Sequence, residues 1–138
     1  NNVKALEVSG YQFYKSSNGS TAFEFSGPGL WGHIYGLASI NPGLKAIKAI
    51  VILHQEETPG LGARIAEGAF LKQFRGKEFL PKLLFVAEGK SSANNEVDAI
   101  TGATGSSRAL EKLLNETLEK NVSLLSEKNA QESRKEKF

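Results

Sequence analysis

Short runs of alternating apolar and polar residues, separated by turn signals, fill the first third of the chain. LEVSGYQFYK, which is broken by Gly10, and STAFEFSG lie on either side of the turn-like stretch SSNG. Branched and aromatic residues in such a pattern are typical of half-buried β-strands. A third strand is expected from about His33 to Ile40, ahead of the turn Asn41-Pro42-Gly43.

The most strongly β-forming run of the chain follows this turn. LKAIKAIVILHQ, Leu44 to Gln55, is rich in Ile and Val and predicts a central strand. It leads into EETPGLG, Glu56 to Gly62, where Pro59 and two glycines disfavour strand and helix and indicate a fixed loop. A short helix is predicted from about Glu67 to Phe74, and two more strands in FLPKLLFVAE and EVDAI.

The last third of the chain has the spacing of an amphipathic helix. From Ser107 onward, leucines recur at positions 110, 113, 114 and 118, and the helix continues or restarts through Leu124 and Leu125. The final stretch NAQESRKEKF is polar and is expected to fray. We therefore expect one α+β domain over residues 1–120, with a mostly antiparallel sheet and helices packed on one side. Residues 121–138 are expected to form a helical and polar tail, partly disordered.

Composition narrows the chemistry available to this domain. The 138 residues are 40% hydrophobic and 23% charged with a net charge of +2, which suits a globular protein and gives nucleic-acid binding little support. The absence of cysteine excludes disulfides, iron–sulfur ligation and thiol catalysis, and two histidines are too few for a histidine-based metal cage. No apolar run reaches the roughly 18–20 residues that a membrane-spanning helix needs.

The stretch TGATGSS, Thr101 to Ser107, carries more small and hydroxylated residues than a turn requires. One interpretation is a turn followed by an N-cap, in which Ser106 or Ser107 accepts a hydrogen bond from a backbone N–H group of the next turn. The other is an anion site, because free N–H groups at a helix start favour a phosphate. Gly102, Ala103 and Gly105 would then let a bulky ligand approach the backbone.

Two further loops allow either a structural or a ligand-binding interpretation. EETPGLG is either a rigid loop with solvated acids or a glycine-rich loop on which a flat ligand lies against backbone amides, beside Thr58 and Leu61. GPGLWG carries the only tryptophan, Trp31, which is either a core residue or an aromatic shield for a planar cofactor. Taken singly, neither loop decides between these interpretations.

In the order GPGLWG, HQEETPGLG, DAITGATGSS, the three loops resemble the FMN-binding domain family of redox-driven ion pumps. The resemblance is closest to the G subunit of the Rnf electron-transport complex, which is related to the C subunit of Na⁺-translocating NADH:quinone reductase. It covers roughly Ser26 to Ser107. In that family the pattern D-x-x-[ST]-G-A-T-x-[ST] is a flavinylation signal, in which a flavin transferase joins FMN from FAD to the last hydroxyl through a phosphoester bond.

On this chain the signal begins at Asp98, has Thr101-Gly102-Ala103-Thr104 as its centre and ends at Ser106, the implied attachment residue. Gly105 fills the variable position, and Ser106 replaces the more usual threonine while keeping the hydroxyl. Ser107 is the acceptor if the register is shifted by one, and Thr104 is the third choice. The resemblance also implies a cofactor groove lined by Thr58, Gly60, Leu61, Gly62, Leu30 and Trp31.

The resemblance implies an electron-transfer subunit of a membrane ion-pumping redox complex, of the ferredoxin or NAD type, matured by a flavin transferase. It further implies a location at the cell membrane, with an N-terminal single-pass anchor that would precede Asn1 and the domain on the extracytoplasmic side. Two alternatives stay open at this stage. One is a flavin domain of another extracytoplasmic redox chain, and the other is an unflavinylated docking module of a membrane complex.

Overall fold

A five-stranded antiparallel sheet forms the main layer of the protein in the computed structural model, which describes residues 3–136. Its strands follow one another in chain order, so each pairs with its sequence neighbour. They are β1 (Val3–Val8), β2 (Tyr11–Ser16), β3 (Thr21–Pro28), β4 (His33–Ile40) and β5 (Ile47–His54). The predicted strand from His33 to Ile40 is present with those bounds, and the predicted strand from Leu44 is shorter at both ends.

After β5 the chain makes a compact layer beside the edge of the sheet. Three short helices follow one another: the 3₁₀ helix η1 (Gly62–Ala66), the α-helix α1 (Gly68–Leu71) and the 3₁₀ helix η2 (Lys72–Phe74). Two three-residue strands, β6 (Leu84–Val86) and β7 (Glu96–Asp98), then pair in parallel. The single helix predicted from Glu67 to Phe74 is thus divided in two at Lys72 and is preceded by a further helical turn.

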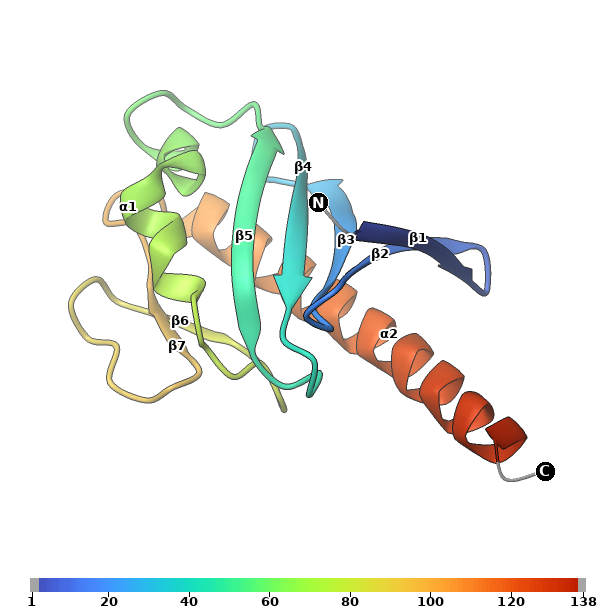
Figure 1. Ribbon diagram of the computed structural model, residues 1–138. Helices are drawn as coiled ribbons and strands as arrows, with labels where there is room; N and C mark the ends of the chain where they lie inside the picture. Colours follow the sequence, from blue (N-terminus) through green and yellow to red (C-terminus); the bar gives the residue numbers. More distant parts are fainter. Residues whose placement is uncertain (1–2, 137–138) are drawn as a thin grey trace.

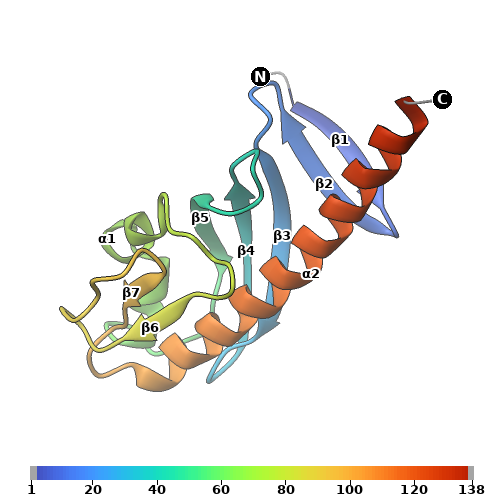
Figure 2. The same cartoon turned by 90° about the horizontal axis from the view of Figure 1, so that it is seen from below.

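The long helix α2 (Thr104–Glu136) runs across one face of the sheet, from the β6–β7 layer to the β1–β2 hairpin (Figures 1 and 2). It starts at Thr104, three residues before the predicted start, so four of the seven residues of TGATGSS lie in its first turn. The boundary expected after residue 120 falls inside this helix. Helical structure also continues to Glu136 through most of the stretch expected to fray, while residues 137–138 lie outside the described residues.

One hydrophobic core fills the space between the sheet, α2 and the β6–β7 layer. Strand side chains alternate, so that β4 buries every second residue from Ile34 to Ile40 and leaves the others partly exposed. The fully buried large side chains come from every layer: Phe13, Phe23, Phe74, Phe79, Ile34, Ile40, Ile47, Ile65, Leu83, Leu110, Leu114 and Leu118. The predicted α+β fold with a mostly antiparallel sheet and helices on one side is confirmed. Within residues 3–136, no helix combines the length and apolar composition required to cross a membrane.

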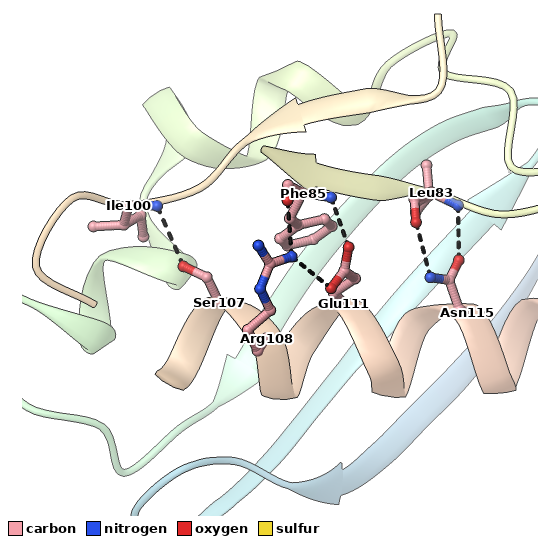
Figure 3. A network of polar contacts seen from close by, with 7 residues as sticks. All are labelled: Leu83, Phe85, Ile100, Ser107, Arg108, Glu111 and Asn115. Atoms are coloured by element: carbon pink, nitrogen blue, oxygen red, sulfur yellow. Dashed lines mark hydrogen bonds and ion pairs between the residues drawn. The ribbon is translucent and has the colours of Figure 1, made fainter. Parts of the chain in front are cut away.

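Side chains of α2 replace a missing neighbour strand along the free edge of β6 (Figure 3). Asn115 Oδ1 accepts from the Leu83 N–H at 2.8 Å, and Asn115 Nδ2 donates to the Leu83 carbonyl at 3.0 Å. One turn earlier, Glu111 accepts from the Phe85 N–H at 2.7 Å, and Arg108 donates to the Phe85 carbonyl at 2.8 Å. The helix therefore satisfies four backbone groups, two of Phe85 within β6 and two of Leu83 just before it.

We expect Asn115→Ala to lower the free energy of unfolding by about 1–3 kcal/mol, because it leaves a buried N–H and C=O group of Leu83 without partners. Urea denaturation followed by tryptophan fluorescence and circular dichroism measures this loss. Glu116→Ala on the exposed side of the same helix is the matched control, and it should leave stability nearly unchanged. An Asn115→Ala variant as stable as its control would show that these bonds add nothing to stability.

Candidate cofactor-binding site

The three glycine-rich loops meet at the first turn of α2. A side chain at Gly105 would overlap Leu30, one at Gly62 would overlap Ser106, and one at Gly102 would touch Leu61. These close approaches bring loop 29–32, loop 57–62 and the helix start into direct contact. The approach is tightest at Gly62, where a β-carbon would meet buried Ser106 and Glu57, whereas at Gly105 it would meet only the end of the exposed Leu30 side chain. The structure therefore assembles in space the loops that the sequence presents far apart.

Ser106 lies in this first turn with only 2% of its surface exposed. Its side chain lies beside Glu57, since atoms of both lie within 3.0 Å of the position that a β-carbon at Gly62 would take. The interpretation of Ser106 as an N-cap is wrong, because α2 begins two residues earlier, at Thr104, and a cap precedes the first turn. Instead, the first turn presents a buried hydroxyl next to a carboxylate.

Glu57 connects all three loops through its two carboxylate oxygens. It accepts hydrogen bonds from the backbone N–H groups of Leu30 at 2.8 Å and Trp31 at 2.9 Å. Burial raises the pKa of this carboxyl, but the Ser106 hydroxyl and the N–H groups of loop 29–32 outweigh burial and lower the pKa below its usual value. Glu57 is therefore a buried anion, and the alternative in which both acids of EETPGLG are solvated is wrong for it.

Ser107 is buried as deeply as Ser106, with 1% of its surface exposed, but it has a different partner. Its hydroxyl accepts from the N–H of Ile100 at 3.2 Å, behind the helix start (Figure 3). The bond therefore ties the helix to the preceding turn, whereas the predicted cap would have satisfied the next turn. Thr104, the third hydroxyl candidate, is exposed, and Ala103 is buried just before the helix.

An apolar rim surrounds the helix start on its solvent side. Trp31 is 71% exposed, Leu30 52% and Leu61 44%, so the only tryptophan is not a core residue. The neighbouring turn is tight: the Thr58 carbonyl accepts from the N–H groups of Leu61 and Ala63, and Gly60 has a φ of +76°. Leu61 is thus held rigidly beside Gly102.

The helix start suits the phosphate of a flavin mononucleotide, and the apolar rim suits its flat ring. The start of a 33-residue helix provides N–H groups and the positive end of its dipole for a phosphate, and Ser106 provides a hydroxyl there. Exposed Leu30, Trp31 and Leu61 provide apolar surface for a flat ring. The model of the FMN-binding domain matches residues 29–119, which include all three loops. The chain belongs to the FMN-binding domain family.

Relatives of this FMN-binding domain come from two kinds of complex. The C subunit of the Na(+)-translocating NADH-quinone reductase from Pasteurella multocida is 38% identical over 85 residues, which make up 58% of this chain and 33% of that protein. The G subunit of the proton-translocating ferredoxin:NAD(+) oxidoreductase complex from Clostridium ljungdahlii is 33% identical over 111 residues, 78% of this chain and 58% of that protein. The chain thus spans less than two thirds of either relative.

The fold of the FMN-binding domain also recurs in a solved relative. The crystal structure of Shewanella oneidensis NqrC superposes with a TM-score of 0.71 at 25% identity, covering 82% of this chain and 61% of that chain. The predicted family is therefore confirmed by sequence and by fold.

Asp98 and Thr101, at the beginning of the predicted flavinylation signal, stabilise the loop before α2. The Asp98 carboxylate accepts from the N–H of Ser91 at 2.9 Å, and the Thr101 N–H donates to Glu88 at 3.0 Å. These bonds fix the loop before α2, and the Asp98 carboxylate is not among the partners of Ser106. Of the signal residues, only Ser106 reaches Glu57.

Glu57 is the site residue that the sequence analysis missed. The two adjacent acids, Glu56 and Glu57, look equivalent in the sequence, yet Glu56 is exposed and Glu57 is 5% exposed. The sequence offered one indication, which is the position of Glu57 directly after a central strand and before a rigid turn. A carboxylate there can serve as the acceptor that the backbone N–H groups of a neighbouring loop need. The family resemblance places Leu30 and Trp31 in the same groove, but nothing in the sequence identified their N–H groups as donors to Glu57.

Proposed function

We propose that this FMN-binding domain carries FMN esterified to Ser106 and passes electrons through it. The observation that carries the proposal is the position of Ser106, a hydroxyl at the start of a long helix, at the end of the D-x-x-[ST]-G-A-T-x-[ST] pattern and beside an exposed apolar rim. When bound, the flavin supplies one- and two-electron redox chemistry, which the side chains themselves lack.

Each part of the site has a distinct role in this proposal. Ser106 anchors the phosphate, and the first-turn N–H groups of α2 neutralise its charge. Leu30, Trp31 and Leu61 line the side of the ring, while Thr58, Gly60 and Gly62 hold the loop that presents Leu61. Ser107 and Thr101 fix the turn before the helix through backbone contacts. A tethered flavin with an exposed rim can exchange electrons with neighbours without dissociating.

The wider setting of the domain is proposed from its relatives. They are components of membrane complexes, so we infer that other subunits of a membrane redox complex donate and accept the electrons, and that a flavin transferase installs the FMN. A single-pass anchor preceding Asn1, with the domain on the extracytoplasmic side, completes the proposal. One relative is named for sodium and the other for protons, so the pumped ion is left open.

The test of the redox role is co-expression of this chain with a flavin transferase of a matching complex. We expect a yellow protein whose flavin absorbance stays with the chain after denaturation, is bleached by dithionite and returns when a one-electron acceptor is added. A known substrate of the same transferase, labelled in parallel, verifies that the transferase is active. A colourless chain beside a labelled substrate would contradict the proposal and favour the docking module.

A further inference from the structure

Ser106 and Glu57 lie too close together for an ester at Ser106 to leave Glu57 undisturbed. Atoms of both side chains lie within 3.0 Å of the position that a β-carbon at Gly62 would take. Esterification removes the only proton that Ser106 Oγ can donate to the carboxylate. It also places a phosphate, which carries a negative charge, beside a buried anion. Two like charges in a poorly solvated site repel each other, so the arrangement around Glu57 must change when Ser106 is modified.

Loop 29–32 also closes over the acceptor in the unmodified chain. Leu30 packs on Gly105, the residue next to Ser106, and Gly62 packs against Ser106 itself. The Leu30 side chain is nevertheless half exposed, so its packing alone holds the loop weakly. The hydrogen bonds that the N–H groups of Leu30 and Trp31 donate to Glu57 fasten this loop above the helix start.

We propose that Glu57 acts as a latch: it holds loop 29–32 over Ser106, so that the Ser106 hydroxyl is inaccessible in the unmodified chain. Loop 29–32 must therefore open before Ser106 can be esterified. This inference rests on the proposed function. In the open state Ser106 Oγ forms a bond to the flavin-side phosphorus of FAD, and the pyrophosphate bond to AMP breaks. AMP leaves with the bonding electron pair and takes up the hydroxyl proton. The ester then keeps Glu57 from closing on Ser106 again.

The latch makes a quantitative prediction about modification by a purified transferase with FAD. Glu57→Gln is neutral and offers only one acceptor oxygen, so we expect it to be labelled at Ser106 on the order of tenfold faster than the wild type. Glu116→Gln, which changes an exposed carboxylate on α2, is the matched control and should be labelled at the wild-type rate. Equal or slower labelling of Glu57→Gln overturns the latch.

A second variant separates opening from general unfolding. Gly62→Ala keeps the Glu57 carboxylate but places a β-carbon within 3.0 Å of both Glu57 and Ser106. The two side chains are therefore pushed apart, and the variant should also be labelled faster than the wild type. Hydrogen exchange measured on both variants should show faster exchange at Leu30 to Gly32 and unchanged protection at the core residues Phe23 and Ile50. Faster labelling only in variants that lose core protection would overturn the latch.

The wild-type chain provides a test that needs no substitution. After labelling, the N–H groups of residues 30–32 should exchange faster than in the unmodified chain, because their bonds to Glu57 are disturbed. Unchanged protection of these groups in the FMN-carrying chain overturns the latch while leaving the proposed function intact. A wild-type chain that is never labelled contradicts the proposed function instead, so the two failures are distinguishable.

Discussion

Ser106→Ala is expected to abolish covalent attachment of FMN, with no flavin absorbance left on the chain after denaturation. The substitution removes the hydroxyl that lies in the first turn of α2 beside the buried side chain of Glu57. The domain should still fold, because Glu57 keeps the N–H groups of Leu30 and Trp31 as partners. Circular dichroism of the variant checks this.

The neighbouring hydroxyls are the matched controls for this experiment. Ser107 is buried and uses its oxygen to accept from Ile100, and Thr104 is exposed one residue before Gly105. We therefore expect Ser107→Ala and Thr104→Ala to keep the covalent flavin when they are co-expressed with the same transferase. Retention of flavin by Ser106→Ala, together with its loss from either control, would move the attachment to another hydroxyl.

Phe74→Ala is expected to lower the free energy of unfolding by about 3–5 kcal/mol. Phe74 is fully buried and packs edge-on against Phe70, with ring centroids 5.6 Å apart, and against Phe85 at 5.8 Å. This cluster joins the short helices to β6. A loss of this size is a large fraction of the roughly 5–15 kcal/mol that stabilises an ordinary domain.

Urea denaturation of Phe74→Ala and of the exposed control Lys72→Ala measures this effect, and the control should stay within about 0.5 kcal/mol of the wild type. The neighbouring Gln73 exchanges two hydrogen bonds with the backbone of Asp98, so the same cluster supports the loop that leads to Ser106. A loss below about 1 kcal/mol for Phe74→Ala would contradict the packing described above.

The strands could be predicted because their pattern is local. Alternating burial along β4 follows from the period of two in its residues, and the predicted bounds His33 to Ile40 are correct. The predicted start of α2 is wrong by three residues, because Thr104 and Gly105 are poor helix formers and resemble part of a turn. Gly105 also lies beside Leu30, a residue far away in the sequence, and no local pattern indicates that contact.

The sequence motifs predicted the candidate site, and the contacts in the structure added Glu57 to it. The order of the three loops was sufficient to indicate the family and to select Ser106, and the structure brings those loops together. The role of Glu57 was out of reach, because its burial is produced by N–H groups of a loop 26 and 27 residues earlier. The exposure of Trp31 likewise depends on how loop 29–32 is fastened, which no local pattern encodes.

The central claim is that Ser106 carries the cofactor, and peptide mapping by mass spectrometry after co-expression with a flavin transferase tests it most directly. We predict an added mass equal to FMN less one water, located on Ser106 and on neither Thr104 nor Ser107. An unmodified Ser106 in a preparation whose transferase labels its known substrate would contradict the claim.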